Sequence, residues 1–157
     1  MERYQPVLVW ISGVGALIAA GVFFAFSNFV MKGLAQIPPA EGMRAMNAIN
    51  VTVINPVFMA ILFGTGAIAI FLAAMNFSSL PDPGAVKIIA GAAIYIVGSL
   101  GVTMAFNVPL NDALAAAGAG DAAAVWADYL KTWLVWNHAR GFASLAAGVL
   151  LLASLFP

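Results

Sequence analysis

The chain has 157 residues, of which 64% are hydrophobic and only 8% are charged. Lys and Arg number 6, as do Asp and Glu, so the formal net charge is zero. A soluble domain usually carries about 25% charged residues, so this composition argues against a water-soluble protein. It also argues against nucleic-acid binding, which needs a basic surface. The sequence has no cysteine, which excludes disulfides, thiolate metal sites, iron–sulfur clusters and a cysteine nucleophile.

Long uncharged stretches separate the charged residues and predict four transmembrane helices. A helix needs about 20 mostly apolar residues to cross roughly 30 Å of hydrocarbon, and it pairs its own backbone groups. The first span is too long for a signal peptide and has no small-residue cleavage site, so we expect it in the mature protein. The sequence therefore predicts one all-α integral membrane domain over 1–157, a four-helix bundle that crosses the membrane several times. The predicted spans are 6–32, 54–78, 86–108 and 131–155.

Shorter elements are expected in the connections. Residues 41–54 are more polar, and Pro56 separates them from the second span, so we expect a short helix there, at the interface or entering the bundle at an angle. The segment 81–84, Pro-Asp-Pro-Gly, predicts a tight turn between the second and third spans. Between the third and fourth spans, a turn at 118–120 precedes Asp121, which is expected to cap another short helix.

In an up-and-down bundle, the end of one helix and the start of the next lie on the same side of the membrane. The polar side chains lie at the end of the first and third spans and at the start of the second and fourth, so they collect at one end of the predicted bundle. An arginine near a helix centre costs at least about 2.5 kcal/mol on insertion scales, so Arg140 is expected to be functional. Its predicted partner is Asp112, with Asp128 or Glu41 as alternatives. The candidate site residues are Asn28, Asn50, Asn55, Asn107, Asn111, Trp133, Asn137, His138 and Arg140.

Helical spacing restricts how the residues of the last span act together. At about 100° per residue, Trp133, Asn137 and Arg140 share one stripe, whereas His138 is turned roughly 160° from Arg140. His138 and Arg140 therefore cannot both point into one cavity unless one of them faces a different gap between helices. A packing role stays open for the asparagines and for His138.

The residue types also limit the cofactors that one chain can hold. A single histidine and no cysteine exclude a bis-histidine haem within one chain and a His-rich zinc or copper site. A haem shared between chains, or a bound quinone or lipid, stays open. What remains is acid–base chemistry by His138, with Arg140 and the asparagines as donors to an oxyanion.

Four sequence motifs point to one family. They are FFAFSNFVM over 23–31, Ile-Asn at 49–50 with Asn-Pro at 55–56, FNVPLN over 106–111 and WLVWNHAR over 133–140. Together they resemble the anthrone oxygenase-like family of small membrane proteins, over nearly the whole chain. The resemblance implies four membrane helices and, by analogy with fungal members, oxidation of an anthrone to an anthraquinone by dioxygen without metal or flavin. The similarity to bacterial-type members implies the bacterial inner membrane.

The resemblance leads to a hypothesis for the reaction. His138 would remove a benzylic proton from an apolar aromatic ketone, and Arg140 with the asparagines would stabilise the enolate. No cofactor is then expected, and the expected partners are this small molecule and membrane lipids. Two other classes stay open: a non-catalytic accessory subunit of a larger membrane complex, and an oligomeric carrier or channel.

Overall fold

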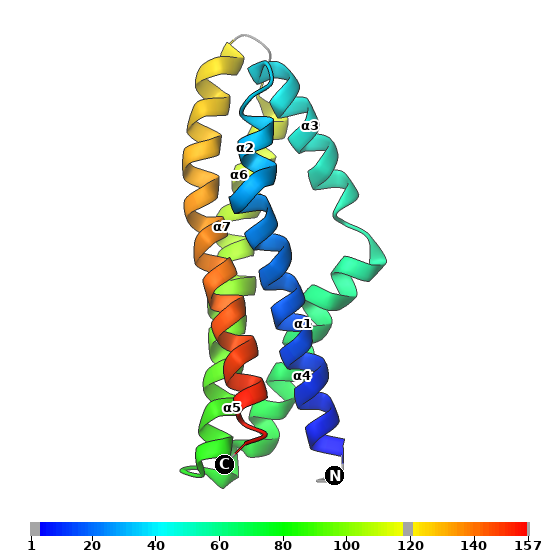
Figure 1. The fold of residues 1–157 in the computed structure, drawn as a ribbon, viewed down its shortest axis with the longest axis vertical. Helices are drawn as coiled ribbons and strands as arrows, with labels where there is room; N and C mark the ends of the chain where they lie inside the picture. Colours follow the sequence, from blue (N-terminus) through cyan, green and yellow to red (C-terminus); the bar gives the residue numbers. More distant parts are fainter. Residues whose placement is uncertain (1–3, 118–120, 157) are drawn as a thin grey trace.

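The computed structural model describes residues 4–117 and 121–156, which are mostly helical with no strand among them (Figure 1). Three helical stretches in this part of the chain are long and apolar enough to cross a membrane: Gln5–Leu34, Pro56–Ser79 and Pro83–Ala116. The fourth predicted span lies in α7 (Ala122–Ala153), a helix of 32 residues. α7 is long enough to cross a membrane but is not among the stretches that are also apolar enough. Asn137, His138 and Arg140 interrupt its apolar sequence.

The first and third stretches each combine several helical segments. Gln5–Leu34 consists of α1 (Gln5–Ala25), the π-helix η2 (Phe26–Val30) and α2 (Met31–Leu34). Pro83–Ala116 consists of α5 (Pro83–Ile94), the π-helices η4 (Tyr95–Gly101) and η5 (Thr103–Asn107), and α6 (Val108–Ala116). π-Helices account for well under 1% of residues in proteins and often occur at functional sites. The three π-helices η2, η4 and η5 all contact α7.

Prolines and side-chain caps set the starts of the middle helices. Proline lies in the first helical turn, where its missing N–H is not needed, in α3 (Pro39–Thr52), α4 (Pro56–Asn76) and α5. Asn55 Oδ1 accepts a hydrogen bond from Phe58 N at 3.0 Å, and Asp82 Oδ1 accepts one from Gly84 N at 2.9 Å. The short helix before the second span and the break before α4 are thus confirmed. The predicted turn at 81–84 is confirmed in part, because Pro83 and Gly84 already belong to the first turn of α5.

The predicted limits of the last two helices are wrong. The third helix does not end at Val108 but passes through Pro109, because the proline falls in the first turn of α6, directly after the wider turn of η5. Asp121 does cap a helix, accepting from Ala124 N at 3.4 Å. That helix is α7 itself and not a separate short one, since the Ala-rich sequence after Asp121 favours helix and contains no break. The turn predicted at 118–120 lies outside the described residues.

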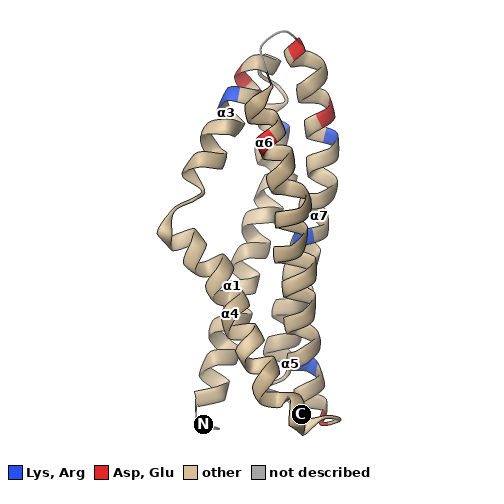
Figure 2. Ribbon diagram, turned by 180° about the vertical axis from the view of Figure 1, so that it is seen from behind, with Lys and Arg blue, Asp and Glu red and all other residues tan. Residues whose placement is uncertain are grey.

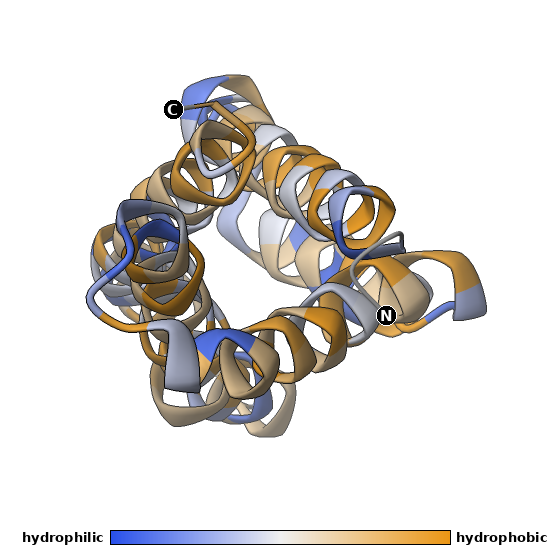
Figure 3. Ribbon diagram, turned by 90° about the horizontal axis from the view of Figure 1, so that it is seen from below, coloured by the Kyte–Doolittle hydropathy of each residue, from blue (hydrophilic) through white to orange (hydrophobic). Residues whose placement is uncertain are grey.

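The surface of the helices is apolar except at the ends. Phe24, Val97 and Phe142 are exposed by 64%, 71% and 68%, and hydrophobic residues occur along all the helices of the bundle (Figure 3). Charged residues gather at the end where α3 lies next to the start of α7 (Figure 2). Soluble monomers rarely expose so much contiguous apolar surface, so the fold is consistent with an integral membrane protein.

An elbow at residues 53–55 joins α3 to α4 and bows away from α1 (Figure 1). Both N- and C-terminal ends of the described chain lie at the far end of the bundle from α3. Val51, Ile54 and Val57 at the elbow are exposed by 75%, 70% and 71%. The elbow thus places apolar side chains outward.

Close packing of η4 on α7 predicts a strong effect of one added methyl group. A Cβ at Gly98 would lie 2.6 Å from the Cβ of Ala143, and neither group can rotate away. We expect Gly98→Ala to destabilise the protein by about 1–3 kcal/mol. Gly64→Ala is the control, because its Cβ would meet nothing within 4 Å. Thermal unfolding of both variants tests the prediction, and equal melting temperatures would contradict this packing.

Candidate functional site

Arg140 is a buried cation whose hydrogen-bond partners are neutral. Its Nε and Nη2 donate to Asn137 Oδ1 at 3.0 and 2.8 Å, and its Nη1 donates to Thr103 Oγ1 at 3.2 Å. The side chain is only 9% exposed. The predicted ion pair with Asp112 is therefore wrong, as are its alternatives. The three acids are exposed toward the end of the bundle, which is beyond the reach of a guanidinium this deep: Glu41, Asp112 and Asp128.

Asn137 holds Arg140 in place and joins α7 to the first helix. Its Oδ1 accepts both bonds from Arg140, while its Nδ2 donates to Phe23 O at 2.8 Å and to Ser27 Oγ at 2.7 Å. Asn137 is fully buried, with 0% exposure, so its amide group is already saturated by the protein. This arrangement defines the position of the guanidinium along α7.

Small hydroxyl groups extend the network away from Arg140. Thr103 Oγ1 donates to Ser99 O at 2.8 Å, and Ser144 Oγ lies 2.8 Å from both Ser99 Oγ and Arg140 O. Thr103 and Ser99 were not among the sequence-based candidates. Their spacing of four residues within an apolar span, matched by Arg140 and Ser144 on α7, is the signal that could have found them.

The guanidinium faces an apolar cavity of about 260 Å³, called here the inner cavity. Phe23 and Trp133 flank the guanidinium, whose carbon lies 4.1 and 5.2 Å from their ring centroids. Among the described lining residues, Arg140 alone is charged. A guanidinium has five N–H donors, and three of them are used in the bonds above, so two remain. The lining comes from α1, η2, α3, the elbow, α4, η5, α6 and α7.

Three asparagines line the inner cavity with different hydrogen-bond states. Asn111 Oδ1 accepts from Tyr129 OH at 2.8 Å and from Trp133 Nε1 at 2.9 Å. Asn107 Nδ2 donates to Trp133 O at 3.4 Å, but its Oδ1 is buried without a partner among the described residues. The Nδ2 of Asn50 is likewise buried and unpartnered there. Unpaired buried polar atoms are rare, so Asn107 and Asn50 are candidates for ligand contacts.

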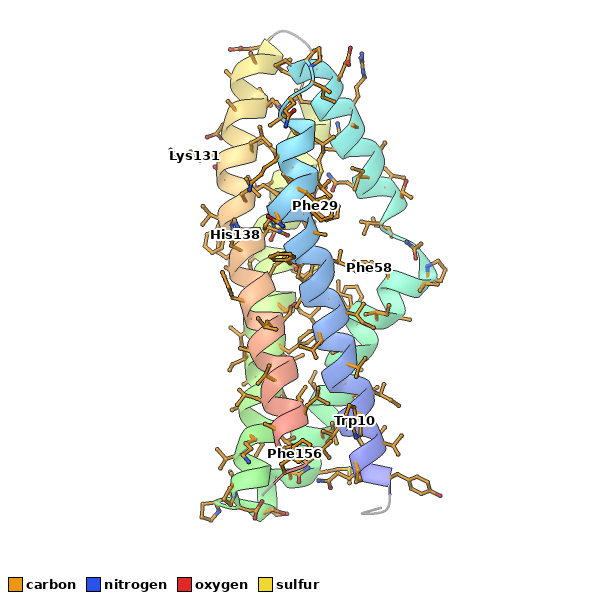
Figure 4. All side chains as sticks on the ribbon, in the orientation of Figure 1. Trp10, Phe29, Phe58, Lys131, His138 and Phe156 are labelled. Carbon is orange, nitrogen blue, oxygen red and sulfur yellow. The ribbon has the colours of Figure 1, made fainter. Side chains whose placement is uncertain are left out.

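His138 lines a separate and more open groove of about 740 Å³, called here the outer groove, between α1 and α7. Its Nδ1 lies 2.7 Å from Leu134 O. Since a carbonyl oxygen only accepts, Nδ1 carries a proton in this contact. In Figure 4, His138 lies on the opposite side of α1 from Phe58, a residue of the inner cavity. This confirms that His138 and Arg140 face different gaps.

The predicted site residues divide between these two places. Asn55 lines neither cavity: its side chain caps α4, and its Nδ2 donates to Thr52 O at 3.1 Å. The inner cavity brings together Asn50, Asn107, Asn111, Trp133 and Arg140. The outer groove has Asn28, Asn137 and His138.

Together, the fold and the cavity define an all-helical, membrane-compatible protein with a cation held inside an aromatic-lined cavity. The sequence model of the anthrone oxygenase family matches residues 52–150, so the chain belongs to this family. The match confirms the resemblance seen in the motifs, and it includes all the candidate residues except Asn28 and Asn50. No match was found among curated proteins or among solved structures.

Proposed function

We propose that the protein is a four-span oxygenase of the bacterial inner membrane, which binds an anthrone-type aromatic ketone in the inner cavity and stabilises its enolate at Arg140. The family match and the three apolar stretches support this proposal. α7 supplies the fourth span: it packs along α1 and α5. Because Asn137 and Arg140 are buried, the folded bundle shields them from lipid.

The buried guanidinium is the observation that carries the proposal. A buried charge is costly unless it is paired, and the hydrogen-bond partners of Arg140 are neutral. An enolate oxygen would supply the missing negative charge and accept the two remaining N–H donors. The apolar and aromatic lining suits fused rings, and preorganised donors in such a dry site are worth more than they are in water.

The proposed reaction converts the ring CH₂ of an anthrone to C=O and uses one dioxygen. Loss of one proton gives the enolate, its carbon adds dioxygen, the peroxide takes up a proton, and water leaves to form the second carbonyl. The two hydrogens of the methylene thus end in water, with dioxygen as the oxidant. The proposal calls on no cofactor.

The role of His138 as the base depends on where the substrate binds. His138 lines the outer groove and not the inner cavity, so it could reach only a substrate bound in the groove. Our proposal places the reaction at Arg140, where the guanidinium stabilises the enolate and water takes up the proton. A general base contributes about 10²- to 10⁴-fold to a rate. Removal of the His138 imidazole therefore distinguishes a substrate in the inner cavity from one in the outer groove.

The test uses the purified protein in lipid nanodiscs, with dioxygen uptake and anthraquinone formation from anthrone as readouts. We expect wild-type protein to exceed empty nanodiscs, and His138→Ala to stay within about threefold of wild type because it lacks contact with the inner cavity. A loss of 100-fold in His138→Ala would move the reaction to the outer groove. A wild-type rate equal to that of empty nanodiscs would reject the oxygenase and favour an accessory subunit.

A further inference from the structure

We propose that Asn107 is a specificity-determining residue of the inner cavity, whose Oδ1 accepts a hydrogen bond from a free hydroxyl group of the bound aromatic ketone. The inference rests on the proposed function, because it concerns a ligand of the same cavity. Asn107 is only 1% exposed, lines this cavity and has no partner for Oδ1 among the described residues. A buried acceptor of this kind calls for a donor from the ligand or from water.

The orientation of the Asn107 amide follows from its other contact. Its Nδ2 lies 3.4 Å from Trp133 O, which can only accept. Turning the amide over would place two acceptor oxygens against each other and lose this bond. The oxygen of Asn107 is therefore the atom left without a partner.

Within the described part of the chain, other polar atoms of the cavity are unpartnered donors, which need a hydrogen-bond acceptor from the ligand. Arg140 has two N–H donors left after its bonds to Asn137 and Thr103. Asn50 Nδ2 is another unpartnered donor. Asn111 Oδ1 already accepts two hydrogen bonds, and the Thr103 hydroxyl both donates and accepts.

A matching ligand therefore has two distinct polar positions on an apolar ring system. A keto or enolate oxygen satisfies the N–H donors, and a separate hydroxyl satisfies Asn107 Oδ1. A plain ketone, or one whose hydroxyl is methylated, leaves this buried acceptor unpaired. That defect should lower affinity by about tenfold to hundredfold.

The test compares a hydroxyanthrone whose hydroxyl is not adjacent to the ketone with its methyl ether. Binding to the protein in nanodiscs is followed by quenching of tryptophan fluorescence, and turnover by anthraquinone formation. Wild-type protein should bind the hydroxyl compound at least tenfold more tightly. Asn107→Leu removes the acceptor while keeping the number and branching of the side-chain heavy atoms, and it should bind the two compounds equally. Asn28→Leu, a change in the outer groove, should keep the wild-type preference.

Three results would overturn the inference. The first is equal affinity of the wild-type protein for the two compounds, which would mean that water alone satisfies Asn107. The others are a preference that persists in Asn107→Leu and binding of neither compound. If Asn107→Leu does not fold, the wild-type ratio still decides. Selective binding without turnover would support the inference while rejecting the oxygenase, so the two proposals fail in different ways.

Discussion

Replacing Arg140 with Met should lower kcat/KM for anthrone oxidation at least about 100-fold, the usual effect of removing one oxyanion donor. The Met side chain fills a similar volume but supplies neither the positive charge nor the N–H groups that face the inner cavity. Arg140→Lys keeps the charge yet cannot make the paired contact of Nε and Nη2 with Asn137 Oδ1. Its rate should fall between those of wild type and Arg140→Met.

The matched control for the Arg140 variants is Lys131→Met. Lys131 is a cation of the same helix, but it is exposed and lines neither cavity. Its replacement should leave the rate unchanged. That result would show that the effect of Arg140→Met comes from losing a cation in the inner cavity and not from lowering the net charge of α7. Dioxygen uptake in nanodiscs measures all three variants. An Arg140→Met protein with the wild-type rate would remove the basis of the proposed site.

Replacing Asn137 with Leu should be the most destabilising change in the network. It leaves Phe23 O and Ser27 Oγ without their donor and Arg140 without the acceptor of two bonds. Each buried polar group left unsatisfied costs about 1–3 kcal/mol, so the expected loss is about 3 kcal/mol or more. For a chain of this size, that corresponds to a fall in Tm of about 6–12 °C.

Thermal unfolding followed by tryptophan fluorescence tests the Asn137 prediction. Asn28→Leu is the control, because Asn28 is exposed and is absent from the network around Arg140. We expect its Tm to change by less than about 2 °C, as is usual for a surface position. A similar small change in Asn137→Leu would show that this asparagine does not join α7 to the first helix.

Most of the fold could be predicted from the sequence, because long apolar stretches and prolines mark membrane helices and their breaks. Errors arose where a local signal had two meanings. The third span was predicted to end at Val108, just before Pro109, yet a proline in a first turn permits a helix to continue after a π-helix. Asn55 before Pro56 was assigned to substrate binding, although an asparagine followed by proline is also a typical helix start.

The candidate site was predictable in part for a similar reason. The depth of Arg140 and the opposite faces of Arg140 and His138 follow from residue counting along one helix. The partners of Arg140 do not, because they depend on how neighbouring helices are rotated and offset. Thr103 reaches Arg140 from η5 across 37 positions of sequence, a relation that periodicity within one helix cannot reveal.

The elbow between α3 and α4 has a consequence for how a solute meets the inner cavity. Val53 and Ile54 form part of the cavity wall at a point where no continuous helix closes it, and Ile54 also faces outward. In the membrane setting proposed above, an apolar molecule dissolved among the acyl chains would reach the cavity from the side at this point, without first passing through water. The quantity that governs occupancy is then the mole fraction of the compound in the bilayer, and its aqueous solubility matters only through partitioning.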